Sequence, residues 1–375
     1  MSERPVINAS LSWYLDVLRF GAALVVLLSH WAYTRFTGGT YGFIRDWNLG
    51  SDAVVLFFVL SGFVITYAAT CKDRTAKRFA FSRLTRLWSV AIPALAITLI
   101  LDGLGVNINP DFYLDSPFYN PTEGWTYWVR GLTFSNHWGG QNIRLGSNGP
   151  YWSLSYEAAY YLIFGIVLYL RKAARLLALL FCVFIFGFKI LLLAPAWFMG
   201  VGLYFAFQNM RHKDVSPALL MLMIFVPIGL YVTFQLQNLP ETLRGLTYIL
   251  LGHDNYLALG FSDEFLWNAL LGGLFTIHLM GAGLLFAQKP DFTVASKSVK
   301  WLAGGSFSLY LVHYPVLQWL GATLPKTEWP ILNHVCLLIG TIFICYTFAA
   351  FFERPLPRYR ALMKRIMYRN IPVQS

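Results

Sequence analysis

Residues 12–33 read SWYLDVLRFGAALVVLLSHWAY, an apolar stretch long enough to cross a bilayer that nevertheless carries Asp16, Arg19 and His30. The apolar length predicts a transmembrane helix, and the charged side chains predict that the helix contributes to a functional site. From Arg19 to His30 an ideal helix turns about 1100° and rises about 16 Å, so both side chains share one face. Asp16 lies three residues before Arg19 and can pair with it. A buried ion pair with a packing histidine is the alternative interpretation.

The composition extends the membrane assignment to all 375 residues, because 57% are hydrophobic and only 13% are charged. The formal net charge of +11 is spread over short loops between apolar runs and forms no continuous basic patch, a pattern that argues against nucleic acid as the partner. The four cysteines fall at or inside apolar runs without paired spacing, so we expect no disulfide framework and no metal site. The N-terminus lacks the features of a cleavable signal peptide.

The hydropathy pattern predicts an all-α polytopic membrane protein with about ten transmembrane helices. We expect them at residues 12–33, 53–70, 87–106, 150–170, 176–193, 195–208, 216–236, 265–287, 301–322 and 330–352. Only Ala194 lies between the fifth and the sixth, which begins at Pro195, and these two could be one broken element. No repeat or soluble segment is visible, so we expect a single integral-membrane domain over residues 1–375. Its basic tail from about residue 353 suits an anionic bilayer surface.

The placement of lysine and arginine predicts the orientation of the chain. With the N-terminus inside, 21 of the 29 basic residues fall in cytoplasmic segments and six fall on the other face. The remaining two, Arg19 and Lys189, lie within the membrane. The positive-inside rule therefore predicts that both termini are cytoplasmic.

Two further motifs lie at or near the second and third spans. The block LFFVLSGF at residues 56–63 contains Ser61 and Gly62, whose small size would let a neighbouring helix approach closely. Arg83 and Arg86 are three residues apart, so on a helical turn they project together, and paired guanidiniums suit a phosphate ligand. Ordinary positive-inside charge is the alternative interpretation of this pair.

The predicted outer half of the molecule also carries candidate site residues. An aromatic loop over residues 107–149 suits either sugar stacking or the membrane interface; it includes Trp125, Tyr127, Trp128, His137 and Trp138. The loop leads into GPYWSLSYEAAYYL, where Glu157 lies about two helical turns inside the membrane and is costly there unless it is paired. The ninth span, within GGSFSLYLVHYPV, places Tyr310 and His313 in its outer half.

Taken together, these motifs resemble the acyltransferase 3 family of polytopic membrane proteins in their order and spacing over nearly the whole chain. They are Arg19 and His30 with ten residues between them, LFFVLSGF at 56–63, Arg83-x-x-Arg86, Trp152-Ser153-Leu154-x-x-Glu157, Gly305-x-x-Ser308-x-Tyr310-Leu311-x-His313-x-Pro315, and Glu353-Arg354-Pro355. Each motif is weak by itself, whereas the set is specific.

The resemblance implies an O-acyltransferase in the bacterial cytoplasmic (inner) membrane. Such an enzyme moves an acyl group, commonly acetyl, from cytoplasmic acyl-CoA to a hydroxyl of a cell-envelope glycan or glycolipid outside. His30 matches the family's essential histidine and Arg19 its partner, while Arg83 and Arg86 match the pair associated with the CoA phosphates. Acyl-CoA is then a substrate, and no tightly bound cofactor is expected.

The chain departs from the family pattern in two respects. Val55 stands where members often have an acidic residue, although Asp52 one turn earlier could serve a similar face. The extracytoplasmic esterase-like domain of many members is not found in this sequence. We therefore expect either direct transfer to the acceptor or transfer to a separate extracytoplasmic partner protein.

The residue chemistry independently separates a cationic inner pole from an outer pole of histidine and glutamate. Acyl transfer to an alcohol needs a base for the hydroxyl proton and donors for the developing oxyanion. We expect His30 to be the base and either Glu157 or Asp52 to orient it. Substrate contacts are expected from Asp16, Arg19, Asp52, Ser61, Arg83, Arg86, Trp152, Ser153, Tyr310 and His313.

Two other classes of membrane protein compete with the enzyme hypothesis. A proton-coupled transporter of a small anionic or glycan-related solute would also place Arg, His and Glu in the membrane, but it should show inverted repeats. We find no convincing internal similarity. A purely structural membrane protein does not explain polar residues in four spans.

Overall fold

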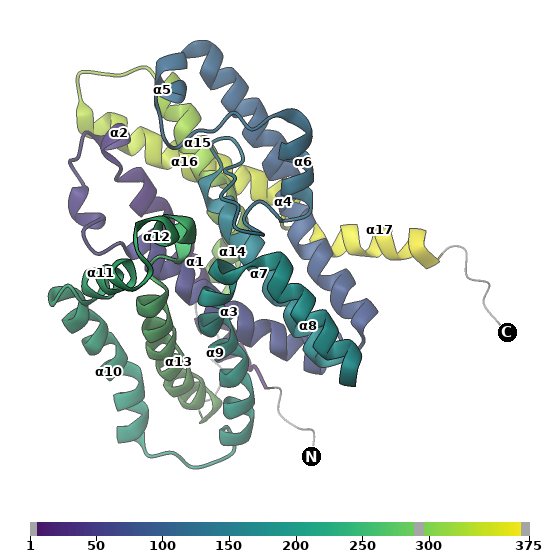
Figure 1. Ribbon diagram of the computed structural model, residues 1–375. Helices are drawn as coiled ribbons and strands as arrows, with labels where there is room; N and C mark the ends of the chain where they lie inside the picture. Colours follow the sequence, from purple (N-terminus) through teal and green to yellow (C-terminus); the bar gives the residue numbers. More distant parts are fainter. Residues whose placement is uncertain (1–5, 289–295, 369–375) are drawn as a thin grey trace. The chain divides into compact units, whose positions relative to one another are not determined.

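The computed structural model describes residues 6–288 and 296–368, and its regular structure in these ranges is helical, without a β-strand (Figure 1). This confirms the predicted all-α class. Arg4, Lys289 and Arg369, which the orientation argument assigns to the cytoplasm, lie outside the described residues.

Each of the ten predicted spans coincides largely with one long helix. The helices are α1 (Ala9–Trp31), α3 (Leu49–Cys71), α4 (Ala76–Ile108), α7 (Trp152–Tyr169), α8 (Lys172–Phe186), α9 (Phe188–Met210), α10 (Pro217–Leu236), α13 (Phe265–Gln288), α15 (Ser306–Thr323) and α16 (Pro330–Phe352). Within the described ranges, seven segments are long and apolar enough to cross a membrane, and they contain α1, α3, α4, α9, α10, α13 and α16. Of the other three, α8 is short, whereas polar side chains lower the hydropathy of α7 and α15. The chain is an integral membrane protein.

Shorter elements occupy most of the connections. They are α2 (Thr34–Thr37), η1 (Gly42–Ile44), α5 (Pro110–Leu114), α6 (Gly124–Leu132), η2 (Gly149–Tyr151), α11 (Leu239–Leu251), α12 (His253–Leu259), η3 (Gly260–Ser262), α14 (Ser296–Ala303) and α17 (Leu356–Tyr368).

Capping residues explain where several helices begin. Asn8 caps α1, because its side-chain oxygen accepts the backbone N–H of Leu11 at 2.9 Å, so the helix starts three residues before the apolar stretch. Ser216 caps α10 in the same way. Pro217 and Pro330 stand in the first turns of α10 and α16, where a missing N–H costs nothing.

Two predicted boundaries are wrong. The break between the fifth and sixth spans lies at Gly187, whose φ of +76° favours glycine, and Pro195 lies inside α9. Membrane helices tolerate an internal proline where their neighbours satisfy the freed carbonyl. The predicted span 301–322 is divided into α14 and α15, and the division falls at Gly304 and Gly305.

The chain forms two compact units. The first unit comprises residues 1–79, 134–143 and 152–303, and the second unit comprises residues 80–133, 144–151 and 304–375. Each is described by itself.

In the first unit, α3 and α9 pack with their backbones in close contact. A Cβ added at Gly62 would lie 2.0 Å from the carbonyl oxygen of Trp197, and one added at Gly200 would lie 2.1 Å from that of Val59. The small-residue contact predicted for the 56–63 block is therefore confirmed at Gly62. Helix α9 also packs on α13, and α13 packs on α10.

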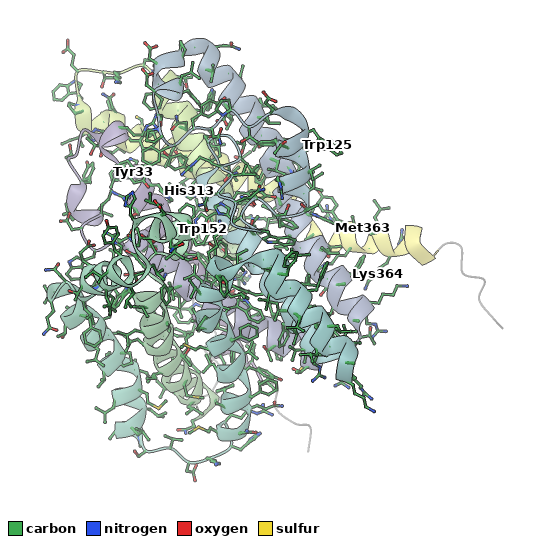
Figure 2. All side chains as sticks on the ribbon, in the orientation of Figure 1. Tyr33, Trp125, Trp152, His313, Met363 and Lys364 are labelled. Carbon is green, nitrogen blue, oxygen red and sulfur yellow. The ribbon has the colours of Figure 1, made fainter. Side chains whose placement is uncertain are left out.

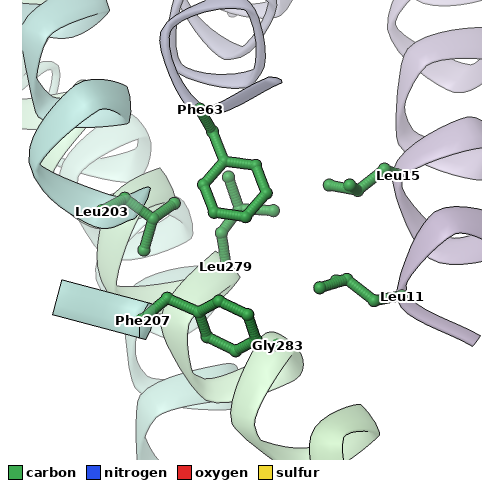
Figure 3. A pocket seen from close by; sticks show the side chains of 7 residues that line it. All are labelled: Leu11, Leu15, Phe63, Leu203, Phe207, Leu279 and Gly283. Atoms are coloured by element: carbon green, nitrogen blue, oxygen red, sulfur yellow. The ribbon is translucent and has the colours of Figure 1, made fainter. Parts of the chain in front are cut away.

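A small pocket lies among α1, α3, α9 and α13 of the first unit (Figure 3). Its seven lining residues are apolar or glycine: Leu11, Leu15, Phe63, Leu203, Phe207, Leu279 and Gly283. A pocket without polar groups offers nothing to orient a polar ligand, so it does not locate the site.

In the second unit, hydrogen bonds join the segment between α4 and α7 to α4. Ser147 donates its hydroxyl (2.5 Å) and its backbone N–H (2.8 Å) to the two oxygens of buried Asp102. Gly146 has φ +61°, and a Cβ there would meet an Asp102 oxygen at 2.3 Å. Buried Tyr127 donates to the carbonyl of Leu95 at 2.8 Å. In the same unit α15 packs on α16.

Candidate active site

His30 lies in the last turn of α1, beside a tyrosine and an arginine. Its ring meets the ring of Tyr33 edge-on, with centroids 5.4 Å apart. The guanidinium of Arg45 lies 4.1 Å from the Tyr33 ring centroid and donates to the carbonyl oxygen of Ser29 at 3.0 Å. Arg45 lies in the segment between α1 and α3. Its side chain thus satisfies a backbone carbonyl in the last turn of α1, next to the histidine.

Arg19 and His30 occupy one continuous helix, as expected. Arg19 and Lys300 act electrostatically on Asp16, a half-buried residue of the same first unit. The pairing of Asp16 with Arg19 on this helix stays a prediction.

Asp52 is 4% exposed and has donors on both carboxylate oxygens. The indole N–H of Trp267 donates to Oδ1 at 2.7 Å. The hydroxyl of Tyr231 and the amide of Gln235 donate to Oδ2 at 2.8 and 2.9 Å. The carboxylate thus joins the first turn of α3 to α10 and α13.

Glu157 meets Ser61, so the first unit brings two of the expected site residues together. The Ser61 hydroxyl donates to Oε1 of Glu157 at 2.8 Å, and Tyr161 donates to the same oxygen. The indole N–H of buried Trp197 donates to the Ser61 oxygen at 3.1 Å. Helices α3, α7 and α9 each contribute to this group.

Trp152 and Ser153 lie at the start of α7. The Trp152 ring stacks on Phe261, with centroids 4.4 Å apart and planes 7° apart, and it meets Tyr156 edge-on. Ser153 is buried. The Trp152 ring therefore places an aromatic surface about one and a half turns before Glu157 on the same helix.

Arg83 and Arg86 lie one turn apart on α4, so the helical turn expected for them is present. Arg86 pairs with Glu353 at 3.1 Å, and the backbone N–H of Ser308 donates to the other oxygen of that carboxylate at 2.8 Å. Arg83 donates to the hydroxyl of Ser82. The closing Glu353-Arg354-Pro355 motif therefore binds the second arginine within the second unit.

Tyr310 and His313 are buried in α15 of the second unit. Tyr310 donates to the carbonyl of Pro150 at 3.3 Å. His313 Nδ1 lies 2.9 Å from the carbonyl oxygen of Leu309, so Nδ1 carries a proton that it donates to this oxygen.

The aromatic outer residues have different environments. Burial raises the pKa of Tyr127, and the Asp102 carboxylate raises it further. Trp138 donates to the carbonyl of Ser155 at 3.0 Å within the first unit, which makes it part of the framework there. Trp125, by contrast, is 81% exposed and points away from α6 (Figure 2).

Sequence reasoning did not identify Arg45, Tyr161, Trp197 or Glu353 as members of these groups. Tyr161 follows Glu157 by four residues, so helical spacing already places it on the same face. Trp197 has no such signal. The described residues include no cluster of three or more His, Cys, Asp or Glu side chains placed to hold a metal ion.

Comparisons with known proteins cover most of the chain. The family model described as an acyltransferase domain matches residues 12–350. Over 155 residues, 40% of this chain, the sequence is 34% identical to the acyltransferase MdmB of Streptomyces mycarofaciens, covering 37% of that protein. Over 173 residues, 45% of this chain, it is 25% identical to the O-acetyl transferase of Shigella phage Sf6, covering 50% of it. The chain thus spans half or less of these curated relatives, and no solved structure matches.

Proposed function

The chain belongs to the acyltransferase 3 family, and we propose that it is a membrane O-acyltransferase that uses cytoplasmic acyl-CoA, with acetyl as the acyl group. The acceptor is a hydroxyl of an extracytoplasmic glycan or glycolipid. The observation that carries the proposal is the family match over residues 12–350, which encloses every expected site residue. The named activities of the two relatives support the same class of reaction.

In this reaction His30 accepts the proton of the acceptor hydroxyl while the hydroxyl oxygen bonds to the thioester carbonyl carbon. The carbon–sulfur bond then breaks, and the CoA sulfur leaves with the proton. Glu157 is the carboxylate assigned to this chemistry, because one of its oxygens is not used by the donors described above. Both oxygens of Asp52 already accept hydrogen bonds.

At the cytoplasmic end, Arg83 and Arg86 are assigned to the CoA phosphates. Arg86 also pairs with Glu353, which holds its guanidinium in place on α4. Changing both arginines to Gln should weaken acetyl-CoA binding strongly, and binding to the native protein should fall as salt rises. Unchanged affinity in the double variant would contradict this assignment.

The first experiment tests the reaction itself. Membranes containing the native chain are incubated with acetyl-CoA labelled in the acetyl group, and label is measured in the polysaccharide and lipid fractions. We expect incorporation that falls about 10²- to 10⁴-fold in His30→Ala. His212→Ala, at an exposed histidine after α9, is the matched control and should retain incorporation. Equal incorporation by native and His30→Ala membranes would contradict the proposal.

The second experiment tests the side of the donor. Acetyl-CoA does not cross a sealed bilayer, so it reaches the cytoplasmic face only in inside-out vesicles. We expect labelled acceptor from inside-out vesicles and little from intact right-side-out vesicles. The opposite pattern would show that the donor binds from the outer face.

A further inference from the structure

The carboxylate of Glu157 is held asymmetrically. Ser61 and Tyr161 both donate to Oε1, and among the described residues of the first unit none donates to Oε2. No Lys, Arg or His of the first unit forms an ion pair with this carboxylate within the described ranges. A half-buried carboxylate is thus supported at one oxygen by neutral donors, while its second oxygen stays available.

The direction of each hydrogen bond in this group follows from chemistry. An indole N–H can only donate, so the Ser61 oxygen is the acceptor in its 3.1 Å contact with Trp197. An ionised carboxylate can only accept, so the Ser61 and Tyr161 hydroxyl protons both point at Glu157 Oε1. Trp197 therefore orients Ser61, and Ser61 and Tyr161 orient the carboxylate.

The side chains that donate to Glu157 and Ser61 are held in place by tight packing. Trp197 is fully buried and Tyr161 is 8% exposed. The contact at Gly62 brings the α3 backbone against the carbonyl of the same Trp197, so Ser61 and the indole are fixed relative to each other. Groups held by packing in this way keep the geometry that a reacting side chain needs.

We propose that Tyr161 and Trp197, the latter through Ser61, are positioning residues that hold Glu157 by Oε1 and present Oε2 to the reacting groups. This inference rests on the proposed function and deepens it. Hydrogen bonds to a charged acceptor are strong, and removing one of two donors allows the carboxylate to rotate.

The kinetic test uses Tyr161→Phe with Tyr160→Phe as its matched control. Tyr160 is the next residue on α7, is fully buried and donates to the carbonyl of Ile190 at 2.7 Å. We expect Tyr161→Phe to lower kcat about tenfold with the KM for acetyl-CoA unchanged, and Trp197→Phe to lower it about threefold. Tyr160→Phe should keep the native kcat. In a Glu157→Gln background, Tyr161→Phe should have no further effect, because the group that it positions is absent.

A second readout does not require transfer activity. A hydrophobic carbodiimide reacts with carboxyl groups in membranes, and a carboxyl group held in place by hydrogen bonds reacts more slowly than one that is free to rotate. We expect Glu157 to be labelled several-fold faster in Tyr161→Phe than in the native protein, and at the native rate in Tyr160→Phe, as measured by mass spectrometry.

These outcomes separate the two proposals. If the native chain transfers no acetyl group, the proposed function fails, and the labelling rates still decide whether Tyr161 acts on Glu157. If the native chain is active but Tyr161→Phe has native kcat and a native labelling rate, only the positioning role is overturned. An equal loss of kcat in the native and Glu157→Gln backgrounds would also overturn it.

Discussion

Two carboxylates of the first unit, Asp52 and Glu157, are surrounded by the same kinds of donor and differ in how many of their oxygens are used. A tryptophan and a tyrosine serve each group: Trp267 and Tyr231 bind Asp52, and Tyr161 binds Glu157 while Trp197 supports its serine. At Asp52 the donors occupy both oxygens, whereas at Glu157 they occupy only Oε1.

This difference separates a structural carboxylate from one that is able to react. Asp52 accepts three hydrogen bonds from α10 and α13, so both of its oxygens are already engaged in holding these helices together. Glu157 is oriented by one oxygen, and among the described residues of the first unit none donates to the other. The sequence left open which of the two carboxylates works with His30, and the arrangement of donors favours Glu157.

The largest expected effect is on transfer. Glu157→Gln keeps the shape of the side chain but removes its negative charge, and we expect acetyl incorporation to fall about 10²- to 10⁴-fold. The yield of folded protein, measured by size-exclusion chromatography in detergent, should stay close to native. Near-native transfer would remove the distinction drawn between the two carboxylates.

The next effect is on stability. Asp52→Ala leaves three donors, two of them buried, without their acceptor, and we expect the free energy of unfolding to fall by about 3 kcal/mol. Thermal unfolding of the detergent-solubilised protein measures this loss. If Asp52→Ala proves as stable as Glu157→Gln, the assignment of Asp52 as a helix anchor is wrong.

A smaller effect is expected at the indole donors. Trp267→Phe removes one donor from Asp52 while retaining an aromatic ring in a buried site, so we expect a loss of about 2 kcal/mol in unfolding free energy. Transfer per folded molecule should remain native, in contrast to Trp197→Phe. A kinetic defect in Trp267→Phe matching that of Trp197→Phe would show that both groups serve the reaction.

The smallest effect is expected for Tyr231→Phe. Gln235 donates to the same Asp52 oxygen at 2.9 Å, so the loss of one hydroxyl leaves Oδ2 with a partner. We expect a destabilisation of about 1 kcal/mol, detected as a small fall in unfolding temperature. A fall larger than that of Trp267→Phe would mean that the two donors on Oδ2 are not interchangeable.

The sequence by itself determined the helices and the family resemblance. Long apolar runs require backbone hydrogen bonds to be satisfied inside each segment, so the ten helices follow from local composition. Helical spacing likewise placed Arg83 beside Arg86 and Arg19 in line with His30. The breaks at Gly187 and between α14 and α15 were not predicted, because a glycine's conformation depends on what it packs against.

Only the tertiary structure decided which polar groups meet. Trp267 is 215 residues from Asp52, Trp197 is 136 residues from Ser61, and Glu353 is 267 residues from Arg86. Periodicity within one helix carries no information about donors supplied by another. The sequence therefore identified Asp52 and Glu157 as candidates, while the hydrogen bonds between α3 and α7, α9, α10 and α13 determined which oxygens of the two carboxylates accept donors in the described part of the first unit.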